Sequence, residues 1–211
     1  MRISKSVALI GALIAATSMF VEAAPLKVVK VSGSTILSAI PIFCNSTRPC
    51  TTVDTVAQFS WQTGGPIAPS ASLLSRTVTF IRPLKPTLKR TVYFYRLVAL
   101  GGSSTECVTK VVMDFGPVTQ IDYDHSGTLS DVVVVVVKNA PPPIAGVTSA
   151  DQVGNTITIN FSPGICKTLF DSSYFFGLAA DTLPQAVKVQ AIVYGGLGTN
   201  PISVDARVPM H

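Results

Sequence analysis

Histidine and glutamate are nearly missing from this chain of 211 residues, which carries 2 histidines and, beyond residue 23, Glu106 as its one glutamate. A Ser–His–Asp relay would have to use His125. Its immediate neighbours are Asp124 and Ser126, and adjacent side chains of an extended chain point apart. The sequence also contains no Gly-x-Ser-x-Gly motif and no glycine-rich phosphate loop. We therefore expect no catalytic residues and no enzymatic activity.

Long apolar runs are missing as well. Residues 7–16 form an apolar stretch after Arg2 and Lys5, but a helix that spans a bilayer needs about 20 apolar residues. A positive start, a short apolar stretch and the small-x-small tripeptide at 21–23 are typical of a cleaved signal peptide. We expect residues 1–23 to be a signal peptide, no transmembrane segment, and a secreted protein that is extracellular or at the cell surface.

Charge is scarce: charged residues make up 13% of the chain and hydrophobic residues 47%, which excludes a disordered protein. So few charges favour an outer surface that is partly covered by neighbouring copies or by other surface components. The formal net charge of +5 is compatible with an acidic polysaccharide as ligand. We expect no nucleic acid partner, because an exported protein rarely meets one.

The cysteine motifs of zinc and haem sites, CxxC and CxxCH, are absent. The chain has an even number of cysteines, and an even number in an exported protein favours disulfides. Three pairings can be drawn, of which we favour Cys44–Cys50 and Cys107–Cys166.

Helix-length amphipathic patterns are also lacking beyond the signal peptide, where a single helical turn at 70–75 is the one candidate. Short β-branched and aromatic runs recur instead between Gly, Pro, Ser and Asn. They predict an all-β, disulfide-bonded, immunoglobulin-like β-sandwich, as one large or two packed small sandwiches. The predicted strands cover 27–32, 35–43, 52–59, 76–81, 90–97, 106–114, 118–123, 131–138, 144–148, 156–161, 174–179, 186–194 and 202–208.

Three consecutive prolines at 141–143 are the best internal boundary, since proline cannot donate to a strand ladder. They predict an N-terminal β-sandwich domain at 24–140 and a C-terminal immunoglobulin-like β domain at 141–211. The second part has fewer strands than the usual seven. It would either pair with strands of the first part or borrow one from a neighbouring subunit.

Six consecutive valines at 132–137 do not alternate with polar residues. A half-buried strand would alternate, so this run predicts a central strand that is covered on both faces.

An acidic segment precedes the valines, with acceptor side chains two residues apart and a glycine after them. Calcium needs several oxygen ligands from one tight loop, so the candidate ligands are Asp122, Asp124, Ser126, Thr128 and Asp131. The segment resembles the first half of an EF-hand loop and the hairpin loops of FG-GAP propeller blades. It departs from both: Val133 stands where the EF-hand has its bidentate Glu, and the closing Asp of the propeller loops comes one residue earlier than Asp131 does. The alternative is a plain hairpin turn, which Asp, Ser and Gly also favour.

Bases and aromatic residues interleave further upstream, and this mixture could bind an anionic polysaccharide. The candidate ligand-binding residues are Trp61, Lys89, Arg90, Tyr93 and Tyr95. An ordinary solvated strand face for the bases, a core position for the tryptophan, and complementary association between subunits are the alternatives.

Together these observations predict an exported, non-enzymatic structural or adhesive protein that self-assembles or joins an extracellular surface structure or fibre. The segment 24–32 could act as a free strand that completes a neighbour's sheet. The alternative is a secreted carbohydrate-binding module, assisted by calcium.

Overall fold

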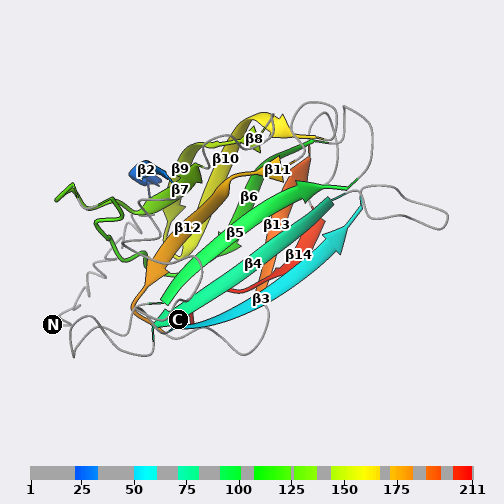
Figure 1. The fold of residues 1–211 in the computed structure, drawn as a ribbon. Helices are drawn as coiled ribbons and strands as arrows, with labels where there is room; N and C mark the ends of the chain where they lie inside the picture. The colour runs from blue at the N-terminus through cyan, green and yellow to red at the C-terminus, as the bar shows by residue number, and fades with distance from the viewer. Residues whose placement is uncertain are drawn as a thin grey trace, which may run out of the picture.

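The computed structural model describes residues 22–32, 50–60, 71–80, 91–100, 107–124, 126–136, 144–166, 172–182, 189–195 and 202–210. Within these ranges every regular element is a strand, and the strands form two sheets (Figure 1). None of the described residues forms a helix that is long and apolar enough to cross a membrane. The predicted signal peptide, apart from its last two residues, lies outside these ranges, as does the predicted strand at 35–43.

The first sheet has six strands, and every neighbouring pair in it is antiparallel. Its order across the sheet is β1 (Ala24–Pro25), β9 (Val147–Val153), β10 (Thr156–Ile165), β6 (Val108–Asp114), β13 (Val189–Gly195) and β14 (Ile202–Ala206).

The second sheet has eight strands. Its order runs through β2 (Val28–Ser32), β7 (Val132–Val136), β12 (Phe175–Ala180), β5 (Thr91–Ala99), β4 (Ala71–Phe80) and β3 (Cys50–Phe59). The short strand β11 (Ser172–Ser173) also pairs with β5, and β8 (Ile144–Ala145) pairs with β11. The pairs β2–β7 and β8–β11 are parallel and the others antiparallel.

A shared hydrophobic core lies between the two sheets. Side chains from both sheets line this core, including Leu73 and Tyr93 from the eight-stranded sheet and Val111 and Ile157 from the six-stranded sheet, all fully buried. Burial on facing sides of two sheets is what defines a sandwich, so the predicted all-β sandwich is confirmed. The immunoglobulin-like assignment stays a prediction.

The valine run lies where its pattern predicts. Val132 and Val134 belong to the core between the sheets, whereas Val133 and Val135 belong to a second apolar cluster with Phe94. Successive side chains of a strand point to opposite faces, so this second cluster covers the outer face of the eight-stranded sheet. The strand β7 is therefore buried on both faces, between β2 and β12.

Strands that precede the prolines at 141–143 in the sequence pair with strands that follow them, and they do so in both sheets. The six-stranded sheet joins β1 and β6 to strands that follow the prolines, and the eight-stranded sheet places β12 between β5 and β7. We therefore describe one two-sheet unit instead of the two domains at 24–140 and 141–211 that the sequence suggested. Of the two arrangements considered for the second part, the structure has the one in which it pairs with strands of the first.

One predicted disulfide is confirmed: Cys107 and Cys166 are bonded at the ends of the neighbouring strands β6 and β10. The bond closes a loop across 59 positions of sequence, which the chain-entropy model values at about 4 kcal/mol of stability. Cys50 is disulfide-bonded too, but its predicted partner Cys44 lies outside the described residues.

Two local predictions were wrong. Of the helical turn expected at 70–75, residues 71–75 are part of β4, which pairs with β3 and β5 along its length. The strand expected at 118–123 is an irregular segment with a single bridge between Ile121 and Ser130.

Candidate functional site

The acidic segment is a turn held by its own carboxylates. Asp122 accepts hydrogen bonds from the backbone N–H groups of Ser126 (3.1 Å) and Gly127 (2.9 Å), and Asp124 also accepts one from Ser126 (3.1 Å). Hydrogen bonds from Ser126 hold the pKa of the Asp124 carboxyl below its usual value. Gly127 has a φ of 81°, in the left-handed region that glycine adopts without strain. These are the side-chain to backbone hydrogen bonds that are typical of a turn. They fit the hairpin turn, which was the alternative to a calcium loop.

The two remaining candidate calcium ligands each make a hydrogen bond within the chain. The Thr128 N–H donates to Ser126 Oγ at 3.2 Å, and Asp131 Oδ2 accepts a hydrogen bond from the Lys27 N–H at 2.8 Å. Asp131 is buried and joins the N-terminal segment to the start of β7. In the described part of the chain no three His, Cys, Asp or Glu side chains are grouped for a metal ion. Calcium binding stays a prediction.

Two of the candidate ligand-binding residues lie in the core. Tyr93 and Tyr95 have no exposed surface, and the Tyr95 hydroxyl donates to the Arg207 carbonyl at 2.6 Å. Burial raises the pKa of both phenols. Neither ring can form the exposed platform for a sugar that the sequence suggested, because stacking needs an accessible ring face. Trp61, Lys89 and Arg90 lie outside the described residues.

The segment 24–32 is not free in this structure. Its strand β1 pairs with β9 of one sheet and its strand β2 pairs with β7 of the other. Val28 packs against the core between the sheets, and Val31 is buried in the outer cluster. The segment therefore closes one side of its own sandwich, and it could complete a neighbour only after leaving this place.

The strand β3 forms the opposite margin of the eight-stranded sheet, where Figure 1 shows it in cyan. Among the described strands it pairs with β4 alone. Ten consecutive residue pairs join β3 to β4 without a shift in register. Residues 51–54, Val56 and Gln58 are exposed, so side chains on both faces of this strand reach solvent.

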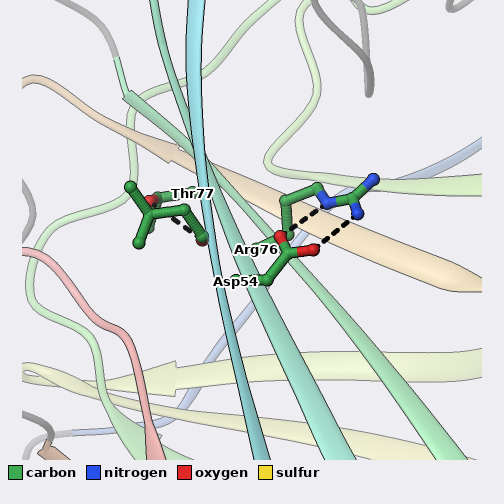
Figure 2. Close-up of polar contacts among 4 residues, drawn as sticks. Asp54, Arg76 and Thr77 are labelled. Carbon is green, nitrogen blue, oxygen red and sulfur yellow. Dashed lines mark hydrogen bonds and ion pairs between the residues drawn. The ribbon is translucent and has the colours of Figure 1, made fainter.

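One charged pair stands on this margin. Arg76 of β4 donates from Nε and from an Nη to the two carboxylate oxygens of Asp54, both at 2.7 Å, as Figure 2 shows. These hydrogen bonds hold the pKa of the Asp54 carboxyl below its usual value and raise that of Arg76. The side chain of Asp54 is 41% exposed and that of Arg76 is 15% exposed. The negative charge of Asp54 is therefore compensated inside its own subunit.

The inner face of β3 is tied to the C-terminal part of the chain. Arg207, just after β14, donates from Nε to Thr55 Oγ1 at 2.6 Å. Thr77 Oγ1 of β4 donates to the Val53 carbonyl at 3.4 Å, a contact that Figure 2 shows. The first contact joins β3 to the segment after β14, and the second joins it to β4. Both contacts therefore hold β3 in its position at the edge of the sheet.

Sequence reasoning found this strand but not its place at an edge. The signal that could have indicated it is composition: residues 50–59 are rich in threonine and valine, with Asp54 as their one charged residue and no lysine or proline. A buried central strand would carry larger apolar residues, and a protected edge would carry charges or proline.

Comparison of the chain with known protein families, with curated proteins and with solved structures finds no match.

Proposed function

We propose that this protein is an exported, non-enzymatic structural component that assembles with copies of itself, or with other components of an extracellular surface, through an edge of its eight-stranded sheet. The observation that carries the proposal is the edge strand β3, which among the described strands pairs with β4 alone. It is ten residues long, unbroken in register with β4 and exposed on both faces.

The physical argument is that a sheet edge presents unpaired N–H and C=O groups, which are a template for pairing with another strand. Proteins that remain monomeric commonly interrupt such an edge with lysine, proline, a bulge or a covering loop. The segment 51–58 has none of the first three, and its exposure leaves little room for the fourth. Its exposed Val53 and Val56 would be removed from water by a neighbour.

Two further observations support export and assembly. The signal-like N-terminus and the disulfide between Cys107 and Cys166 fit an oxidising compartment outside the cell. The low content of charged residues, 13%, fits a surface that is covered in part by other chains.

The test is the mass distribution of residues 24–211, purified with disulfides intact and measured by light scattering over a wide concentration range. We expect particles larger than a monomer, with a mass that rises with concentration. Measurements with calcium and then with a chelator separate an edge-driven assembly, which is indifferent to both, from one held by the acidic turn. A monomer at every concentration would contradict the proposal. Glycan binding by such a monomer would support the carbohydrate-binding alternative.

A further inference from the structure

We infer that β3 pairs in antiparallel fashion with β3 of a second copy, so that the two eight-stranded sheets become one continuous sheet across a two-fold axis. This inference rests on the proposed function and adds to it the contact, the partner and the register.

The strand is suited to edge pairing along most of its length. Across residues 51–58 the pairing with β4 is regular, so the outer side of β3 offers its backbone groups at regular spacing. Val56 is 59% exposed, more than any other large apolar side chain in the described part of the chain. An exposed valine on a regular sheet edge costs free energy in the monomer, and a second strand laid along residues 51–58 would lower that cost.

The charges on this edge point to a second copy as the partner. Asp54 is the only formally charged residue of β3, and Arg76 of the same subunit already neutralises it. Two identical edges therefore meet without a net charge on either. A strongly basic or acidic partner would find no uncompensated opposite charge on β3 to bind. An identical, neutral edge needs no such charge to pair with it.

Symmetry limits the register. A two-fold axis perpendicular to the sheet keeps each face on its own side, so only residues of the same face can stand opposite each other. If the axis passes at Val56, each Val56 stands opposite its copy. Each Asp54 then stands opposite Gln58, whose amide can donate to it, and Thr55 stands opposite Ala57.

The neighbouring registers are less favourable. If the axis passes at Thr55 or at Ala57, each Val56 stands opposite Asp54 or Gln58 and not opposite another apolar residue. If the axis passes at Asp54, the two carboxylates stand opposite each other, and like charges directly across a strand pair are destabilising. Each Val56 would then face Thr52 and not another apolar residue. The register centred on Val56 keeps the carboxylates apart and buries the most exposed apolar side chain of the edge.

The experiment uses residues 24–211 and a matched set of variants at exposed positions. In the proposed dimer, Val56→Lys places two lysines directly opposite each other, and so does Val56→Glu with two glutamates. Leu129→Lys is the control, because Leu129 is 52% exposed in the turn before β7 and lies on no strand. We expect each Val56 variant alone to weaken self-association at least tenfold by sedimentation velocity. An equimolar mixture of the two should associate again, and Leu129→Lys should behave as the wild type.

A second measurement tests the register. Directly opposed residues of an antiparallel pair bring their Cα atoms to about 4.5–5.5 Å, a separation that suits a disulfide. Val56→Cys should therefore form a covalent dimer under mild oxidation much faster than Leu129→Cys does.

The outcomes separate this inference from the proposed function. If the wild type associates, and the Val56 variants associate equally well, the β3 contact is wrong and assembly uses another surface. If the lysine variant dissociates but Val56→Cys does not cross-link faster than Leu129→Cys, the edge is used in another register or by another partner, and the symmetric pairing is wrong. If the wild type is monomeric at every concentration, both the inference and the proposed function are overturned.

Discussion

Lys27 and Asp131 exchange two hydrogen bonds across 104 positions of sequence: the Lys27 N–H donates to Asp131 Oδ2 at 2.8 Å, and the Asp131 N–H donates to the Lys27 carbonyl at 3.0 Å. The Val132 N–H donates to the same carbonyl at 3.1 Å. This contact begins the parallel pairing of β2 with β7, and it fixes the register in which the N-terminal segment closes the sandwich.

The first prediction concerns this contact. We expect Asp131→Ala to lower the free energy of unfolding by about 1.5–3 kcal/mol, since a buried carboxylate that accepts a backbone hydrogen bond is removed. Urea unfolding measures the loss. Backbone amides of β2 should also exchange with solvent faster in the variant, while those of β12 keep their protection.

Asp122→Ala is the matched control for this prediction. Its carboxylate also accepts backbone hydrogen bonds, but in an exposed turn where water can replace it. We expect a loss of about 1 kcal/mol or less. Equal losses in the two variants would mean that Asp131 does not anchor the N-terminal segment.

The second prediction concerns Gly177, which stands between Phe94 and Val133 on the outer face of the eight-stranded sheet. A Cβ atom added there would lie 2.7 Å from two carbons of the Phe94 ring and 3.2 Å from Val133 Cγ1. Both neighbours are fully buried, so they have little room to move. We expect Gly177→Ala to lower the free energy of unfolding by about 1–3 kcal/mol through overpacking.

Gly146→Ala is the control for Gly177→Ala, because an added Cβ there meets no atom within 4 Å. Thermal and urea unfolding of the two variants should differ clearly, with Gly146→Ala within about 0.5 kcal/mol of the wild type. Should Gly177→Ala be as stable as Gly146→Ala, the outer cluster would be looser than its burial indicates.

How far the sequence predicts this fold depends on the range of the interactions involved. The valines at 132–137 predict a strand buried on both faces, because a run of apolar residues without polar ones leaves no face for solvent. Residues 70–75 suggest a helical turn locally, yet 71–75 form part of β4 because pairing with β5 and β3 on both sides outweighs a weak local preference.

The candidate site was harder to predict for the same reason. Asp131 fits a calcium loop in sequence, but its partner is Lys27, which no local pattern brings close. Tyr93 and Tyr95 stand in a strand whose residues 91–95 are all buried, so the missing alternation there was a usable sign of burial. Whether a strand such as β3 ends up at an edge is set by the topology of the whole sheet, which one strand's composition does not determine.

The third prediction concerns the disulfide of Cys107 and Cys166, which joins two strands that are already paired. Replacing both cysteines with alanine should lower the free energy of unfolding by about 4 kcal/mol, because the unfolded chain regains the freedom of a long loop. Urea unfolding of the double variant beside the oxidised wild type measures this. A loss below about 1 kcal/mol would mean that the unfolded chain retains enough structure around this loop to make the cross-link unimportant.

The last prediction concerns the pH dependence of the pair on the β3 margin. Hydrogen bonds from Arg76 lower the pKa of Asp54 in the folded state. The pair therefore stabilises the fold fully above the unfolded pKa of about 3.9, and its contribution is lost as the pH falls through the lower folded pKa. Because Asp54 is 41% exposed, we expect a contribution of about 1 kcal/mol or less.

Urea unfolding of the wild type and of Asp54→Asn, both at a concentration low enough to keep them monomeric, measures this contribution without interference from assembly. At neutral pH the wild type should have the higher free energy of unfolding, because its charged carboxylate accepts hydrogen bonds from Arg76 better than an amide does. At about pH 2 the free energies of unfolding of the two proteins should converge, since the protonated acid and the amide are then both neutral. A difference that stays constant from neutral to acid pH would show that the charge of Asp54 adds nothing and that the contact acts through shape alone.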